Sequence, residues 1–236
     1  MRAGGEGPTE TRVDELDITE SSAEARDTGR IEAFSDGVFA IAATLLVLQV
    51  AVPESSTNLL RTVLHQWPAF LAYAISFVTI LIMWINHNMI MRQIGHADHG
   101  FKVLNGALLM AITFVNYPTA LLARYLTTPQ ERDAALIFNG TYVVVALCFL
   151  ALWRYSAHRG RLLSRQADPR LVAAISRSYR FGPLIYLVAT IAAFASVPVS
   201  LAINGGLALY WAIFGARAVG EFGAGATARR PRWRTR

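Results

Sequence analysis

The sequence predicts an all-α membrane protein with six transmembrane helices per subunit, and three observations lead to that prediction. Hydrophobic residues make up 54% of the 236 residues and charged residues only 16%, whereas soluble domains carry about 25% charged residues. The apolar residues gather in long blocks, as membrane-spanning helices require. The basic residues fall almost entirely on one side of the topology that these blocks imply.

The apolar blocks predict, in chain order, helices over residues 33–52, 67–88, 102–124, 134–154, 180–197 and 199–217. Each approaches the ~20 residues that cross about 30 Å of hydrocarbon at 1.5 Å per residue. The last two are short and separated only around Pro198. They are therefore either two tilted helices or a tight re-entrant hairpin.

Two polar tails flank the helical domain, which covers residues 30–217. Residues 1–29 hold eight acidic residues and lack an apolar period, which predicts a disordered segment. Residues 218–236 are rich in Gly, Ala and Arg and are expected to form a mobile, basic tail. Next to membrane spans, such a tail favours attraction to anionic lipid over binding of nucleic acid.

The basic residues predict the orientation. With both termini placed in the cytoplasm, all but three of the 22 Lys and Arg residues lie in cytoplasmic segments, and only Arg61, Arg124 and Arg132 lie outside. Cytoplasmic loops of membrane proteins carry such an excess of positive charge, and an odd number of spans would destroy it. The almost complete use of Arg in place of Lys hints at a high-GC genome, so we expect the inner (plasma) membrane of a bacterium.

The first predicted helix carries an ionisable residue, Asp36, which is the one formal charge inside the apolar spans apart from their terminal residues. A carboxylate in hydrocarbon is costly and is by default a candidate functional residue with a partner. Depth in the membrane makes Trp84, Asn86 and His87, at the end of the second helix, its candidate partners.

The same helix carries an aliphatic stripe about 140° from Asp36 at 100° per residue. Periodicity alone favours lipid or the protein core as the surroundings of this stripe over a central axis. Its members are Phe34, Val38, Ile41, Leu45, Leu48 and Val52.

Three motifs resemble a known family. The first is Arg30-x-x-x-Phe34-Ser35-Asp36-Gly37, which runs into an Ile/Thr/Leu-rich helix, and the second is Trp84-x-x-His87. The third runs from Leu104-Asn105 to Phe114-x-Asn116-Tyr117-Pro118-Thr119-Ala120-Leu121-Leu122. In this order they are similar to the signature of the endolysosomal potassium channel family (transmembrane protein 175) and its prokaryotic relatives, with Asn116-Tyr117 in place of the usual first Pro-aromatic pair.

The resemblance implies a six-helix subunit without a pore loop, assembled as a homotetramer whose first helix lines a central pore. Carried over by position, it implies a pore constriction at Ile41, Leu45 and Leu48, with Thr44 as a polar neighbour. It also implies a network that braces the first helix against its neighbours. The bracing residues would be Arg30, Ser35, Asp36, Trp84 and His87.

The predicted function is a potassium-selective, or weakly selective, cation channel with an aliphatic constriction. The alternatives are a proton-coupled secondary transporter that uses Asp36 as its proton site, a membrane enzyme built on His87, His96 and His99, and a structural scaffold. We expect a non-enzymatic protein without a cofactor, with potassium only as the permeant ion. No metal site is expected, because His96, Asp98 and His99 form an incomplete ligand set for zinc.

The expected partners are further copies of the chain and membrane lipid, with no nucleic acid and no obligate soluble partner. The sequence contains no TVGYG-type segment, so a filter of backbone carbonyls is not predicted.

Overall fold

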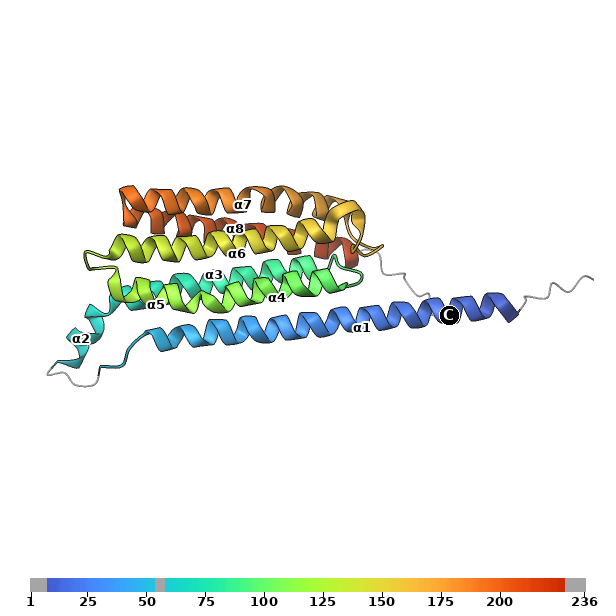
Figure 1. Cartoon of the computed structure of the whole chain (residues 1–236), viewed down its shortest axis with the longest axis horizontal. Coiled ribbons are helices and arrows are strands. Elements are labelled where there is room, and N and C mark those ends of the chain that lie inside the picture. The colour runs from blue at the N-terminus through green and yellow to red at the C-terminus, as the bar shows by residue number, and fades with distance from the viewer. Residues whose placement is uncertain (1–7, 54–57, 228–236) are drawn as a thin grey trace, which may run out of the picture.

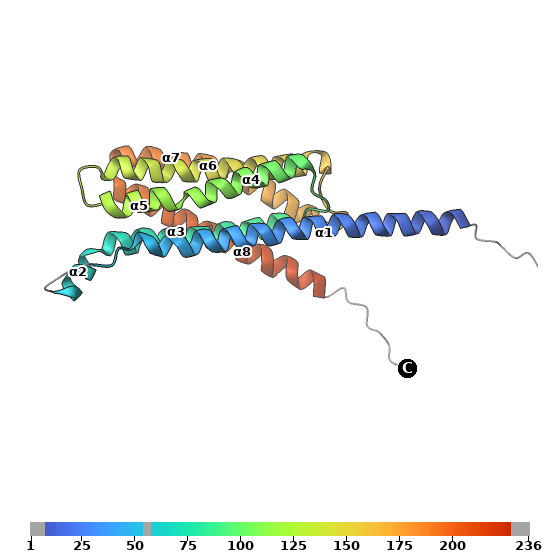
Figure 2. The same ribbon diagram turned by 60° about the horizontal axis from the view of Figure 1, so that its bottom comes forward.

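The protein is a bundle of membrane-spanning helices, shown by a computed structural model in Figures 1 and 2. The structure describes the backbone of residues 8–53 and 58–227, and the side chains of residues 26–53 and 58–213. The described residues form helices without any named strand. The prediction of an all-α membrane protein is confirmed.

The helices follow one another with short connections. In chain order they are α1 (Pro8–Leu45), η1 (Leu46–Gln49), α2 (Leu59–His65), α3 (Trp67–Met91), α4 (His99–Phe114), α5 (Asn116–Tyr125), α6 (Glu131–Ala157), η2 (His158–Gly160), α7 (Pro169–Ala195) and α8 (Val197–Thr227).

Five helical stretches of the described chain are long and apolar enough to cross a membrane. They are Arg26–Gln49, Trp67–Met91, His99–Tyr125, Glu131–Gly160 and Pro169–Ala195. A sixth apolar stretch, Val197–Ile213, is shorter and belongs to α8, which continues to Thr227. Each of the six predicted positions therefore contains a helix. The helix at the fifth position, α7, has 27 residues, which is too long for one arm of a tight re-entrant hairpin.

The third predicted span is broken into α4 and α5 at Val115. The backbone N–H of Val115 bonds to Ile112 O, three residues back, and Pro118 has no N–H to give to Phe114 O. The predicted position of this span is correct, but its continuity is not. Tertiary contacts compensate, because Ser76 Oγ and Thr119 Oγ1 lie 2.8 Å apart in the buried contact between α3 and α5.

The helix at the N-terminus is longer than the sequence indicated. Residues 8–29 were expected to be disordered, but α1 begins at Pro8 and runs without interruption to Leu45. Extending an existing helix by one residue costs far less than starting one, so a membrane-anchored helix can continue into a polar segment. Residues 1–7, which belong to the same predicted tail, lie outside the described residues, as do residues 228–236 of the predicted basic tail.

The centre of the bundle lies around α6, and α1 lies at its edge. α6 packs against α4, α5, α7 and α8, whereas α1 packs against α3 and α4. Figure 1 shows α1 along one side of the bundle, and both views show its N-terminal part extending past the other helices (Figures 1 and 2).

Candidate functional site

The predicted constriction residues lie on the free surface of α1 and η1. Exposed fractions are 58% for Ile41, 44% for Leu45 and 72% for Leu48. The opposite side of the same helix is buried against the bundle, through Phe39 and Ala42, which are 2% and 0% exposed. Apart from Val38, which is half-buried and packs against the core, the aliphatic stripe is therefore not part of the core of the single chain. It faces either lipid or further subunits.

Thr44 lies on the same free surface and is exposed. Its hydroxyl donates a hydrogen bond of 3.0 Å to Ile41 O, one turn back along the helix. The donor of Thr44 is thereby used within the helix, and the oxygen can still accept through its remaining lone pair. Thr44 thus presents an acceptor oxygen between two aliphatic side chains.

A buried chain of hydrogen bonds ties α1 to α4 and α3. Ser35 Oγ, which donates to Ile31 O at 2.8 Å, accepts 2.9 Å from Asn105 Nδ2 on α4. Asn105 Oδ1 lies 2.9 Å from His87 Nε2 on α3, so the imidazole donates through this nitrogen. Ser35, His87 and Asn105 are all almost completely buried. The predicted bracing residues Ser35 and His87 belong to one network, joined by an amide that was not assigned a role.

Asp36 has a separate partner. Trp84 Nε1 on α3 donates to Asp36 Oδ1 at 2.8 Å, and Asn88, with its amide nitrogen turned to the carboxylate, adds a second donor at 3.2 Å. Of the three candidate partners, only Trp84 bonds to Asp36. Asn86 does not reach it, because its side chain bonds to Ile82 O at 2.9 Å and lines a pocket bounded by α3, α6, α7 and α8.

Arg30 does not join this network in the single chain. It is exposed, and the described residues show no hydrogen bond or ion pair to it. Its predicted bracing role therefore stays a prediction that concerns neighbouring subunits or lipid. Near it, α1 is held to α4 by an ion pair between Asp27 Oδ2 and Lys102 Nζ, 2.6 Å apart.

Two asparagines on the third span were not predicted as site residues. Asn105 joins Ser35 to His87 as described above, and Asn116 Nδ2 donates to Ala42 O of α1 at 3.3 Å. An amide inside an apolar span usually bonds across helices. This rule could have marked both asparagines as bonding residues, but it does not predict the helix to which each one bonds.

Asp98, at the cytoplasmic end by the predicted orientation, is the centre of a polar cluster. Its Oδ1 accepts 2.8 Å from Phe101 N and thereby caps α4, while Oδ2 accepts from Tyr155 Oη at 2.8 Å and from Arg161. These donors, with the Phe101 N–H first, hold the pKa of Asp98 below its usual value, and the bond to Asp98 raises the pKa of Arg161. The carboxylate weighed earlier as a metal ligand thus binds protein donors, and no group of three or more His, Cys, Asp or Glu side chains converges within the described part of the chain.

Comparisons with known proteins match the region that contains the site. The family model described as the endosomal/lysosomal potassium channel TMEM175 matches residues 30–115. A potassium channel from Chamaesiphon minutus is 48% identical over 194 residues, which cover 80% of this chain and 96% of the relative. A potassium channel from Streptomyces collinus is 39% identical over 188 residues, which cover 78% of this chain and 91% of the relative.

A solved structure shows the same fold. The crystal structure of a lysosomal potassium-selective channel TMEM175 homologue from Chamaesiphon minutus matches with a TM-score of 0.74 at 45% identity, covering 80% of this chain and 98% of that chain. The residues matched by the family model include all predicted site residues, from Arg30 to His87.

Proposed function

The chain belongs to the TMEM175 potassium channel family, and from this membership we propose that it conducts potassium ions through a pore lined by α1. The activity is ion conduction, and the chain is not an enzyme. Its relatives from Chamaesiphon minutus and Streptomyces collinus are named potassium channels. For this chain we also propose the location of the constriction, at Ile41, Leu45 and Leu48.

One observation carries this placement. From Phe34 onward, α1 exposes most of its aliphatic stripe, and its hydrogen bonds to side chains of α3, α4 and α5 lie on the other side, at Ser35, Asp36 and Ala42. A helix fixed in this way has one rotational setting. Four copies around an axis would therefore present the same aliphatic ring at each level, with Ile41, Leu45 and Leu48 at three successive levels.

An aliphatic ring selects ions by the cost of removing water. Potassium holds its hydration shell less tightly than sodium, so a narrow apolar passage favours potassium, and the discrimination is modest because no oxygen ligand replaces the lost water. A hydrophobic constriction can also close by dewetting. The acceptor oxygen of Thr44, between two of the rings, would be the nearest polar contact for a passing ion or its water.

The proposed assembly is a homotetramer in the inner membrane of a bacterium, with both termini in the cytoplasm. The exposed stripe on α1 supports further copies of the chain as partners, and the apolar spans support lipid as the surrounding medium. Potassium is the permeant species, and the proposal includes no cofactor.

The test is potassium and sodium flux into liposomes that contain the purified protein. Ile41→Asn is compared with Ile191→Asn on α7, since Ile191 has nearly the same exposed fraction, 59% against 58%. A polar ring at the constriction should raise conductance and lower the ratio of potassium to sodium flux. The same change on the lipid-facing side should alter neither.

Two outcomes would contradict the proposal. Equal effects of the two variants would indicate that the stripe on α1 faces lipid and does not line a pore. Saturable flux that depends on a proton gradient and disappears in Asp36→Asn would favour the transporter alternative.

A further inference from the structure

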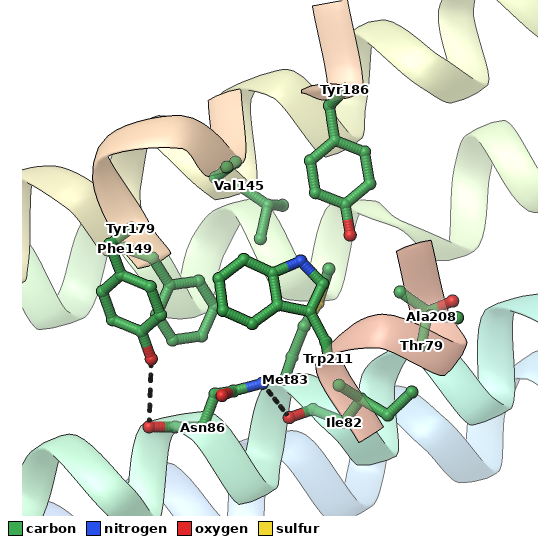
Figure 3. A pocket seen from close by; sticks show the side chains of 12 residues that line it. Thr79, Ile82, Met83, Asn86, Val145, Phe149, Tyr179, Tyr186, Ala208 and Trp211 are labelled. Atoms are coloured by element: carbon green, nitrogen blue, oxygen red, sulfur yellow. Dashed lines mark hydrogen bonds between the residues drawn. The ribbon is translucent and has the colours of Figure 1, made fainter. Parts of the chain in front are cut away.

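A pocket lies on the side of α3 that faces away from α1. It is bounded by α3, α6, α7 and α8 (Figure 3) and is partly open, with a cavity volume of about 40 Å³. A cavity needs about 10–15 Å³ to hold one water molecule, so this cavity is larger than a single water site. Met83 and Asn86 line the pocket, whereas Trp84 and His87 of the same helix bond toward α1 and α4. The pocket is thus separate from the proposed pore face.

Four of the twelve residues that line the pocket are aromatic, and they come from three helices. Phe149 comes from α6, Tyr179 and Tyr186 from α7, and Trp211 from α8, and the rings of Tyr179 and Trp211 lie 5.5 Å apart. Flat rings favour stacked or edge-on contact with another aromatic system. The wall therefore favours an aromatic occupant over a flexible chain.

One polar atom of the lining has no partner. Asn86 Oδ1 is buried without a hydrogen bond, and the residue is only 5% exposed. Its amide nitrogen donates to Ile82 O, which fixes the orientation of the amide and leaves the oxygen to the pocket. In Figure 3 this oxygen lies below the rings of Phe149 and Trp211. Leaving such an acceptor unsatisfied costs about 1–3 kcal/mol.

Water would satisfy this acceptor but not the aromatic wall. A buried water makes two to four hydrogen bonds, and the hydroxyls of Thr79 and Tyr179, which donate within the protein, can still accept from it. A molecule with an apolar aromatic body and a single donor satisfies both the wall and the acceptor.

We propose that this pocket binds a small aromatic molecule that carries one hydroxyl or N–H donor, and that the donor bonds to Asn86 Oδ1. The rings of α6, α7 and α8 hold the aromatic body. The amide of α3 fixes its orientation.

The experiment uses two probes of similar shape, 1-naphthol, which has a donor, and 1-methylnaphthalene, which has none. Tritiated forms of both are bound to the purified full-length protein in detergent and measured by scintillation proximity. Asn86→Leu removes the acceptor at similar volume and should weaken 1-naphthol binding roughly three- to tenfold, the value of one neutral hydrogen bond. Binding of 1-methylnaphthalene should not weaken.

A second pair of variants tests the location. Ala208 lines the pocket and is 7% exposed, so Ala208→Phe should fill it and abolish saturable binding of both probes. Ala202→Phe makes the same change at an exposed position of the same helix and should leave binding intact. Saturable binding that survives Ala208→Phe, equal weakening of both probes by Asn86→Leu, or no saturable binding at all would overturn the proposal. If Ala208→Phe does not elute from size exclusion as the folded protein, the test rests on Asn86→Leu. The deciding quantity is then the ratio of its affinities for 1-naphthol and 1-methylnaphthalene, compared with wild type.

Discussion

α1 and α6 are both membrane-spanning helices, but they are held in opposite ways. In the most apolar 18-residue window of Arg26–Gln49, 22% of the residues are buried, against 44% in the corresponding window of Glu131–Gly160. α6 is surrounded by helices and packs aromatic rings such as Phe138 and Tyr142 against each other. α1 is fastened on one side by polar bonds from α3, α4 and α5.

The difference between α1 and α6 follows from the lipid that surrounds a membrane protein. Between helices in lipid there is no hydrophobic driving force, so association depends on close packing and on hydrogen bonds. A helix that leaves much of its surface uncovered by its own chain has little packing area within that chain. Polar bonds at defined points then set its position. Substitutions that remove these bonds should therefore displace α1 more than substitutions elsewhere.

The largest effect is expected from Asn105→Leu. The change removes the donor to Ser35 Oγ and the partner of His87 Nε2. Since His87 Nδ1 already lacks a partner, the buried imidazole would have no bond at either nitrogen. We expect a loss of about 2–4 kcal/mol in unfolding free energy, at about 1–3 kcal/mol for each unsatisfied group. Flux per folded channel should also change, because α1 would no longer be held at one rotation about its own axis.

Denaturation in mixed micelles measures the stability, and liposome flux normalised to protein recovered by size exclusion measures the function. Wild-type flux from a destabilised Asn105→Leu protein would show that this network does not position the pore.

Asn139→Leu makes the same substitution in the other region and sharpens the comparison. Asn139 Nδ2 donates to Ser200 Oγ at 2.7 Å, and its Oδ1 accepts from Asn204. Ser200 Oγ keeps its bond to Ala189 O and Asn204 keeps its bond to Ser200 O. We therefore expect a smaller loss of stability, about 1–2 kcal/mol for two bonds between membrane helices.

The same denaturation and flux assays apply, with an unchanged ratio of potassium to sodium flux expected. A change in that ratio would mean that the two regions are not independent.

Two tryptophans give a smaller, matched test. Trp84→Phe removes the 2.8 Å bond to Asp36, and Trp153→Phe removes a 2.8 Å bond to Ser176 Oγ between α6 and α7. Each should cost about 0.6–1.7 kcal/mol in unfolding free energy. Only Trp84→Phe should alter single-channel conductance in planar bilayers, because only that bond fixes α1. Equal conductance in the two variants would count against a bracing role for Asp36.

The smallest effect is expected at the exposed Asp98 cluster. The folded state lowers the pKa of Asp98, so the carboxylate stabilises the fold above its usual pKa. That stabilisation is lost as the pH falls through the lowered value. Melting temperatures of wild type should therefore decline in acid more steeply than those of Asp98→Asn. Asp133→Asn, an exposed aspartate on α6, is the control, and a parallel decline in all three proteins would exclude the contribution of Asp98.

Hydropathy and charge predicted much of the fold, because each span must satisfy its backbone bonds internally and present apolar side chains to lipid. The continuation of α1 to Pro8 and the break at Val115 were not predictable in this way, since both depend on neighbouring turns and tertiary bonds. Within the candidate site, Ser35 is buried and Trp84 bonds to Asp36, while the bracing role of these residues stays a prediction. The amides of Asn105 and Asn116 were missed, because a periodic pattern identifies a polar residue in a span but not the helix to which it bonds.

The unbroken course of α1 has a mechanical consequence. From Pro8 to Ser35 the helix measures about 40 Å, and from Ser35 to Leu45 about 15 Å, at 1.5 Å per residue. If the buried bond at Ser35 holds and the attachments at Asp27 and Ala42 yield, the helix acts as a lever with unequal arms about Ser35. A sideways displacement of the N-terminal end would reach Leu45 reduced to somewhat under half, with the force increased in the same proportion. A weak pull on the N-terminal arm would thus move the arm that carries Ile41 and Leu45 by a smaller distance and with a larger force.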